Sequence, residues 1–256
     1  GVVIIPAESG ELASGLDGTG RMAEPENIFV KIEEFFKENQ DPKIAGKHVL
    51  ITAGPTYEAL DPVRFIGNHS SGKMGYAIAE KFLAEGARVT LVSGPTKLSL
   101  DHPNLSLISI SSAQEMLEVV QSNWNSCDYG VFAAAVADYR PADVADQKIK
   151  KSSEEMTLKL VKNPDVLLWA GSNKTNQVVV GFALETNDLE SNAQKKLSKK
   201  NLNFIVMNTL QDEGAGFAHD TNKISILDDR NNMVSFELKT KNEVASDIVA
   251  YLKKYI

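Results

Sequence analysis

A polar loop at residues 61–76 carries the side chains best suited to chemistry in this sequence. The loop reads DPVRFIGNHSSGKMGY. It gathers a guanidinium, an amide, an imidazole, two hydroxyls and an amine, at Arg64, Asn68, His69, Ser70, Ser71 and Lys73. Such groups donate hydrogen bonds to phosphate oxygens and stabilise negative charge that develops during a reaction. The loop therefore predicts a site for a nucleotide or another phosphate ligand.

Two well-known phosphate-binding patterns come close to this loop. Residues 67–73 satisfy the spacing G-x-x-x-x-G-K of a P-loop, but Met74 stands where a Ser or Thr hydroxyl is needed for Mg²⁺. The dinucleotide fingerprint needs three glycines close to the first strand, and only Gly72 and Gly75 have the right spacing. Three interpretations stay open beside another nucleotide-using enzyme: a P-loop NTPase, a Rossmann-type NAD(P) oxidoreductase with a degenerate loop, and a solvated loop whose glycines only turn the chain.

Regular elements on both sides position this loop. Residues 48–53 form a short, apolar, β-branched run that ends at Gly54, which is typical of a buried strand. Residues 75–85 have apolar side chains at helical spacing and are followed by Gly86, a typical C-cap. A second apolar run, at 88–93, completes a βαβ unit, and loops at the carboxyl ends of such strands bind nucleotides.

The rest of the chain continues the alternation of strands and helices. We expect strands at 105–110, 129–136, 178–182 and 204–207, helices from Ser112, at 189–200 and at 244–255, and a hairpin of 223–228 with 233–237. These elements predict an α/β fold, a Rossmann-like three-layer α/β/α arrangement with a mostly parallel central sheet and a small C-terminal hairpin extension.

Charged residues beyond the loop add candidates for nucleotide contact. Asp138 follows a predicted strand, where a carboxylate binds a ribose hydroxyl or metal-bound phosphates, although it could also cap a helix or turn. Residues 148–151, Lys-Ile-Lys-Lys, should lie on a loop. In the predicted helix at 189–200, Lys195 or Lys196 and Lys199 or Lys200 share a helix face at i and i+4. For both basic groups, phosphate contact and plain solvation stay open.

Composition excludes several classes of protein. A net charge of −7 argues against a general nucleic-acid binder. Cys127 is the only cysteine, so the chain has no disulfide framework and no cysteine zinc site, which fits a reducing cytoplasm. No apolar run approaches the length of a membrane span. We expect a cytoplasmic protein that binds neither nucleic acid nor membranes.

The N-terminal segment lacks enough apolar residues for a core of its own. Its glycine-rich part, from Gly10 to Arg21, predicts a mobile flap, and an apolar stripe from Ile28 to Phe36 predicts an amphipathic helix. We expect residues 1–40 to pack on a partner or on a further domain, residues 41–47 to form a linker, and residues 48–256 to form the main domain.

From about residue 47 onwards the sequence closely resembles the phosphopantothenate–cysteine ligases, the synthetase half of bacterial bifunctional coenzyme A biosynthesis enzymes. The matching motifs are ITAGPT at 51–56, the loop from Asp61 to Gly75, AAVADYR at 134–140, KIKK at 148–151, KNPD at 162–165, and GFA at 181–183 with ETN at 185–187. The N-terminal segment resembles the closing part of the FMN-dependent decarboxylase half. Ser14 occupies the place of that half's proton-donating cysteine. Its flavin-binding body and catalytic histidine have no counterpart here, so we expect no decarboxylation by the chain as given.

The resemblance implies a reaction in two steps. CTP and 4′-phosphopantothenate give an acyl-cytidylate and pyrophosphate, and the amine of L-cysteine then gives 4′-phosphopantothenoylcysteine and CMP. Asn68, Lys148 and Arg64 are implied to be catalytic, with Asn68, Arg64 and Ala135 holding the intermediate. The implied nucleotide site consists of Ala133, Ala134, Asp138, Lys148, Pro164, Asp165, Val166, Leu167, Phe182, Lys196 and Lys200. Mg²⁺ is implied by the triphosphate chemistry, with ligands that the sequence does not identify.

The resemblance also implies an assembly. The ligase domain is expected to form a homodimer, and a larger oligomer together with the decarboxylase half, which alone would bind FMN. Two alternatives from other classes remain: the NAD(P) oxidoreductase, and a non-catalytic assembly module whose N-terminal flap completes the flavin site of a neighbour.

Overall fold

The computed structural model describes residues 2–11, 15–38, 41–150, 154–185, 189–209 and 220–255. Contacts divide the chain into two compact units, Gly1–Pro42 and Lys43–Ile256. Residues 43–47 of the predicted linker pack with the larger unit, where Ile44 is fully buried and the Gly46 amide donates to the Gly86 carbonyl at 2.9 Å. The assignment of the two units to different enzymes stays a prediction.

The smaller unit consists of one hairpin and one helix. Strand β1 (Glu8–Glu11) pairs antiparallel with β2 (Asp17–Arg21), so part of the predicted flap is paired backbone. Helix α1 (Pro25–Glu38) confirms the predicted amphipathic helix and begins at a proline, which suits the first helical position. Its apolar residues Phe29 and Ile32 are exposed, as expected for a segment without a core. Ser14 lies outside the described residues.

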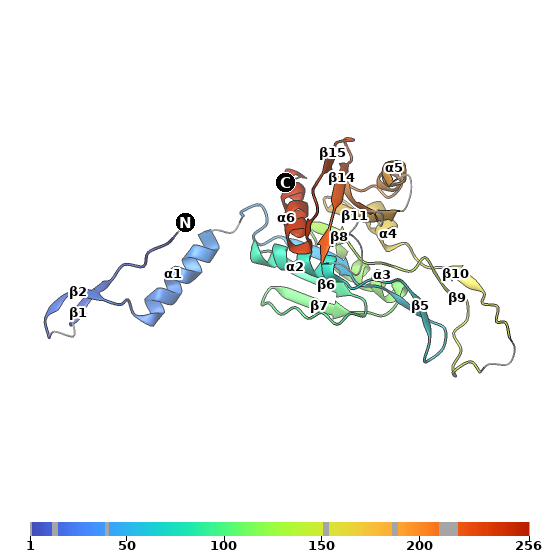
Figure 1. Ribbon diagram of the computed structural model, residues 1–256, viewed down its shortest axis with the longest axis horizontal. Coiled ribbons are helices and arrows are strands. Elements are labelled where there is room, and N and C mark those ends of the chain that lie inside the picture. The colour runs from blue at the N-terminus through green and yellow to red at the C-terminus, as the bar shows by residue number, and fades with distance from the viewer. Residues whose placement is uncertain are drawn as a thin grey trace. The chain divides into compact units, whose positions relative to one another are not determined.

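The larger unit is built on one eight-stranded sheet (Figure 1). Its strands lie in the order β15-β14-β12-β11-β8-β3-β6-β7. Their bounds are β3 His48–Ala53, β6 Arg88–Ser93, β7 Leu105–Ser109, β8 Tyr129–Phe132, β11 Val178–Glu185, β12 Phe204–Thr209, β14 Ile224–Asp228 and β15 Met233–Ser235. The six strands from β12 to β7 are parallel, and the β14–β15 hairpin extends the sheet antiparallel. The mostly parallel sheet and the C-terminal hairpin are thus confirmed.

Alternate strand residues face two helical layers. Val49 and Ile51 of β3 pack with α2 (Lys73–Ala84) and α6 (Lys241–Leu252), which the short helix η1 (Lys253–Tyr255) continues. Leu50, between them, faces the cluster of α3 (Ala113–Trp124), α4 (Val166–Ser172) and α5 (Leu189–Lys199). Because side chains of a strand alternate between faces, an apolar run with helices on both sides gives three layers. The predicted α/β/α arrangement is therefore confirmed.

In the described part of the larger unit, three small sheets lie outside the central one. They pair β4 (Tyr57–Ala59) with β5 (Phe65–Gly67), β9 (Tyr139–Pro141) with β10 (Leu160–Lys162), and β13 (Thr221–Asn222) with β16 (Lys239–Thr240). The β4–β5 pair is inserted between β3 and α2. A dinucleotide fingerprint needs a tight turn from strand to helix at this point, so the insertion argues against the oxidoreductase alternative.

Among the element ends that differ from the sequence prediction, two adjoin the loops after β3 and β8. Helix α2 begins at Lys73 rather than Gly75, after Gly72, which turns the chain at φ +78°. The strand predicted at 129–136 ends at Phe132. Beyond it the Ala133 and Ala135 amides still donate to the Thr52 and Gly54 carbonyls at 3.1 and 2.9 Å. The Ala134 amide donates to the Thr52 hydroxyl at 3.3 Å, and residues 133–138 form a loop with one isolated bridge to Pro55.

No helix in the described ranges is both long and apolar enough to cross a membrane.

Gly75 gives the first testable prediction, because α2 crosses β3 there at close range. A Cβ at this position would lie 2.5 Å from the Ala53 Cβ and 3.1 Å from its Cα. Overpacking of this kind costs about 1–3 kcal/mol, more than the ~1 kcal/mol that the helix propensity of alanine returns. We expect Gly75→Ala to lower the free energy of unfolding measured in urea. Glu80→Ala, at an exposed position of the same helix, is the control and should change it by less than about 0.5 kcal/mol. A midpoint for Gly75→Ala equal to or above that of the unaltered chain would contradict the packing.

Candidate functional site

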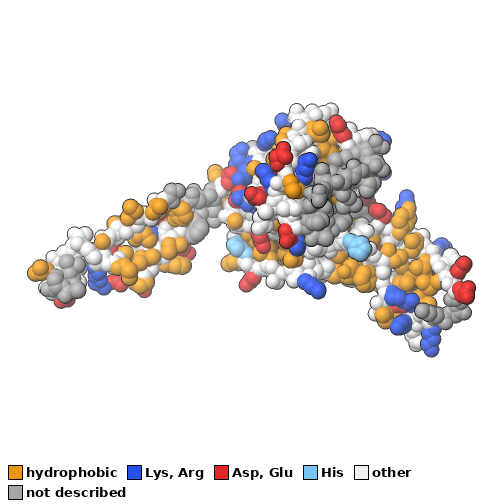
Figure 2. All heavy atoms as spheres, viewed as in Figure 1, with side chains coloured by type: hydrophobic (Ala, Val, Ile, Leu, Met, Phe, Trp, Pro, Cys, Tyr) orange, Lys and Arg blue, Asp and Glu red, His pale blue; other side chains and the backbone are white. Residues whose placement is uncertain are grey.

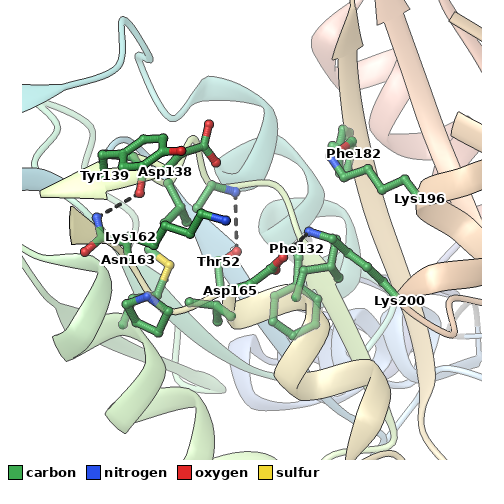
Figure 3. A pocket seen from close by; sticks show the side chains of 17 residues that line it. Thr52, Phe132, Asp138, Tyr139, Lys162, Asn163, Asp165, Phe182, Lys196 and Lys200 are labelled. Carbon is green, nitrogen blue, oxygen red and sulfur yellow. Dashed lines mark hydrogen bonds and ion pairs between the residues drawn. The ribbon is translucent and has the colours of Figure 1, made fainter. Parts of the chain in front are cut away.

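A cavity of about 450 Å³ opens where β3, β8 and β11 end (Figure 3). Parallel strands bring their carboxyl ends to one edge of a sheet, which is where ligands bind in open α/β folds. Thr52 and Phe132 contribute from strand ends, and the loops 134–139 and 162–167 form two walls. Lys196 and Lys200 approach from α5 and the residue after it. The cavity thus combines an apolar floor with charged groups at its rim.

Most residues expected at the nucleotide site line this cavity. They are Ala134, Asp138, Pro164, Asp165, Val166, Leu167, Phe182, Lys196 and Lys200. Ala133 and Lys148 are not among the lining residues, and Lys148 is exposed on the loop after β9. The sequence analysis missed several lining residues, among them Thr52, Phe132, Tyr139, Lys162 and Asn163. Lys162 and Asn163 belong to the KNPD motif, which was available as a signal.

Two of the cavity lysines have partners within the protein. Asp165 caps α4 by accepting the Leu168 amide at 2.9 Å, and its carboxylate also pairs with the Lys200 amine at 2.7 Å. Lys196 donates to the Phe182 carbonyl at 2.7 Å. The Lys200 side chain is only 17% exposed, so its positive charge is held beside the Asp165 carboxylate at the cavity wall.

Asn163 joins the two loops that form the walls. Its side-chain amide donates to the Ala137 carbonyl at 2.8 Å, and its backbone amide donates to the Asp138 carbonyl at 2.9 Å. Arg140 donates to the Lys162 carbonyl at 2.8 Å and to the Asn163 side-chain oxygen at 3.2 Å. These bonds fix the position of Asp138, just before β9, relative to Lys162, which ends β10.

A buried carboxylate organises the loop that the sequence singled out. Asp61 is 2% exposed and accepts bonds from the Val63 and Arg64 amides at 2.8 and 2.9 Å. The Arg64 guanidinium donates to it at 2.5 and 2.9 Å. Together with the Ile149 amide, at 3.1 Å, these donors hold the pKa of Asp61 far below its usual range, although burial acts in the opposite direction. Arg64 thus has a structural role here as well as the expected catalytic one.

Asn68 reaches across to the loop that follows β8. Its side-chain nitrogen donates to the carbonyls of Ala135 and Val136 at 3.2 and 3.0 Å. Two carbonyl oxygens facing the same end of the amide require the nitrogen there, so the amide oxygen points the other way as an acceptor. The structure therefore brings Asn68 and Ala135 together, as the expected intermediate site requires.

Lys73, also named in the loop, lies elsewhere. It forms an ion pair with Asp220 and lines a second cavity of about 330 Å³ between α2 and α6. Its amine is therefore not part of the main cavity.

The carboxylates of the cavity suit a metal that a substrate brings with it. Within the described residues no group of three or more His, Cys, Asp or Glu side chains could hold an ion. Mg²⁺ commonly binds through one or two carboxylates plus substrate phosphates and so needs no such group. Asp138, exposed at the rim of the cavity, is a carboxylate that fits this mode.

Comparisons with known proteins give the family. A family model described as DNA/pantothenate metabolism flavoprotein C-terminal domain matches residues 44–255. The chain is 45% identical over 251 residues to the coenzyme A biosynthesis bifunctional protein CoaBC of Bacillus subtilis strain 168, covering 97% of this chain and 61% of that protein. It is 50% identical over 249 residues to a cysteine/cysteine sulfinic acid decarboxylase of an unknown prokaryotic organism, covering 96% and 69%.

A solved structure agrees with these relatives. The crystal structure of the C-terminal domain of the coenzyme A biosynthesis bifunctional protein CoaBC is 39% identical, with a TM-score of 0.71, and the likeness covers 84% of this chain and 97% of that one. The matched family model spans nearly all of the larger unit, including both walls of the cavity. The chain therefore belongs to the family of the DNA/pantothenate metabolism flavoprotein C-terminal domain.

Proposed function

We propose that the larger unit is a phosphopantothenate–cysteine ligase of coenzyme A biosynthesis that uses CTP. The observation that carries this proposal is the cavity at the carboxyl edge of the sheet, where nine of the residues expected to bind the nucleotide meet. The bifunctional CoaBC relatives and the match over residues 44–255 support the same assignment. Since the chain spans 61% of the Bacillus subtilis protein, the activity of a longer protein is a separate question.

The first step forms the acyl-cytidylate. A carboxylate oxygen of 4′-phosphopantothenate attacks the α-phosphorus of CTP, and the bond to the β-phosphate breaks with release of pyrophosphate. A bound Mg²⁺ would neutralise phosphate charge, and Asp138 is the residue that we propose to hold it. Lys196 and Lys200 add positive charge to the same cavity, which favours the binding of a polyanion.

The second step transfers the acyl group to cysteine. The amine of L-cysteine attacks the acyl carbon, the carbon–oxygen bond to the phosphate breaks, CMP leaves and the amine loses a proton. We propose that Asn68 keeps the acyl phosphate aligned for this attack. The bonds from Asn68 to Ala135 and Val136 fix the loop along which the intermediate would lie.

Lys148 is proposed to act from an anchored loop rather than from the cavity wall. Its neighbour Ile149 donates its amide to Asp61 and accepts from Arg64 at 2.8 Å. These two bonds hold the start of the KIKK segment beside the turn of Asp61 and Arg64. Lys151 lies outside the described residues.

We further propose a homodimer formed through the larger unit. Phe65, Tyr139 and Leu160 are 52%, 46% and 43% exposed, on the two small sheets β4–β5 and β9–β10. Figure 2 shows hydrophobic side chains gathered on the lobe that carries β9 and β10. Exposed apolar side chains beside unpaired strand edges favour association with another chain.

Decarboxylase activity is not proposed for the chain as given. In the decarboxylase half that the N-terminal segment resembles, the proton donor is a cysteine thiol, and Ser14 stands in its place. A serine hydroxyl does not titrate near neutral pH, so it is a poorer acid than a thiol. Cys127, the single cysteine, is buried within the larger unit and cannot substitute for it. A free cysteine and the biosynthetic role agree with the expected cytoplasmic location.

The choice of nucleotide gives the next prediction. Incubated with 4′-phosphopantothenate and L-cysteine, the chain should release pyrophosphate with CTP much faster than with ATP. Omission of 4′-phosphopantothenate should abolish the release, because its carboxylate is the attacking group. A coupled pyrophosphate assay measures both effects. Equal rates with the two nucleotides would contradict the use of CTP, and release without 4′-phosphopantothenate would contradict the ligase.

Asn68→Asp separates the two steps. A carboxylate cannot donate to the Ala135 and Val136 carbonyls, so the alignment of the acyl phosphate should be lost while the lysines of the cavity remain. We expect CTP affinity within a few fold of the unaltered chain, accumulation of acyl-cytidylate, and a second step slowed by about 10²–10³. Rapid quench with mass detection of the intermediate is the measurement.

The matched control for the added charge is Asn104→Asp, at an exposed position before β7. It should leave both steps unchanged. Product formation by Asn68→Asp at the unaltered rate, or complete loss of CTP binding, would show that the assigned role of Asn68 is wrong.

A further inference from the structure

The charged side chains that line the main cavity differ in how many of their hydrogen bonds and ion pairs are made within the protein. Asp165 and Lys200 pair with each other, and Lys196 is bonded to the Phe182 carbonyl. The remaining cation is Lys162, whose amine has no partner among the residues that the structure describes. Of the three cavity lysines, Lys162 alone can therefore bind a ligand without sharing or exchanging an existing protein contact.

The backbone of Lys162 is fixed although its side chain is exposed. Lys162 ends β10 and pairs with Tyr139 of β9. Its carbonyl accepts the Arg140 guanidinium at 2.8 Å, and the next residue, Asn163, is bonded to Ala137 and Asp138. Figure 3 shows the Lys162 side chain projecting among the side chains that line the cavity. A fixed backbone with an uncommitted amine reduces what must be ordered when a ligand binds.

The chemistry of the Lys162 amine determines which part of a ligand it would bind. An ammonium group has three donors and no acceptor, and it acts as a compact positive charge. Its strongest complement is an anionic oxygen, which accepts a hydrogen bond and carries the opposite charge. Asp138, the residue just before β9, also lines the cavity and would repel a bare phosphate, so Lys162 also balances the acidic side of the cavity mouth.

We propose that Lys162 is a nucleotide-binding residue that contacts the phosphate groups of the nucleotide. The proposal rests on the proposed function, since it takes the cavity to be the nucleotide site. It assigns to the first residue of the KNPD segment a direct contact, whereas Asn163 and Arg140 are positioning residues that set the place from which Lys162 reaches. It also makes the phosphate contacts of the cavity depend less on Lys200, which is engaged with Asp165.

The test compares CTP binding by three variants of the chain through isothermal titration calorimetry at several salt concentrations. Lys162→Gln should weaken CTP binding by about tenfold or more, the scale of one hydrogen bond to a charged group. The same change should reduce the salt dependence of binding, because one ionic contact is lost. Lys162→Arg keeps the charge and should bind within about threefold of the unaltered chain, since a point-charge contact tolerates the longer guanidinium better than loss of charge.

Lys159→Gln is the matched control. Lys159 is also exposed and lies just before the same strand, but three residues away along it, so its side chain projects from the opposite face. It should leave both CTP affinity and salt dependence unchanged. A thermal unfolding midpoint equal to that of the unaltered chain confirms that each variant is folded.

Two results would overturn the inference. If Lys162→Gln binds CTP with the affinity and salt dependence of the unaltered chain, Lys162 is only a solvated surface residue and the proposed function stands without it. If the unaltered chain binds no nucleotide, the proposed function fails and the inference fails with it. Restored binding in Lys162→Arg, together with weak binding in Lys162→Gln, supports a charge contact and excludes a purely structural role.

Discussion

The buried carboxylate of Asp61 is the constraint on which the arrangement of the loops depends. A charge with almost no exposure is costly unless donors surround it, and here the donors come from its own turn and from Ile149, far along the chain. Satisfying Asp61 therefore requires the Arg64 turn and the KIKK segment to meet. The low pKa of Asp61 is the consequence of these bonds, and it keeps the carboxylate ionised at any pH at which the fold is used.

The central sheet imposes a second constraint on the arrangement of the loops. Parallel strands with apolar residues on both faces need helices on both sides, and each crossover returns the chain to the same edge. The polar loops after β3, β8 and β11 thus converge at the ends of adjacent strands although they are distant in sequence. Close packing at Gly75 lets α2 lie directly on β3, which sets where the Asn68 loop must end.

Local patterns predicted the regular elements well because they depend on near neighbours. The apolar run of β3, the stripe of α2 and the capping pair Ser112 and Glu115 each report a short-range preference, and the Ser112 side chain accepts the Glu115 amide as expected. The end of β8 was missed because it depends on contacts with another strand, among them the bond from the Ala134 amide to the Thr52 hydroxyl. The KNPD motif pointed to Lys162, but the lack of a partner for its amine among the described residues is recognisable only in the structure, where Lys196 and Lys200 have theirs.

Two neutral side chains, Asn68 and Asn163, also position the loops around the cavity. The Asn68 side chain donates hydrogen bonds to two carbonyls, and Asn163 joins the two cavity walls through hydrogen bonds from its amides. Neither side chain carries a charge. Charged side chains at the same places would have to be neutralised by the protein and would be lost to the ligand. With amides holding the loops, Asp138 and Lys162 stay available at the cavity mouth as one anionic and one cationic side chain. A nucleotide triphosphate with its metal also carries both signs of charge, so this pair of side chains is matched to the complex rather than to the anion alone.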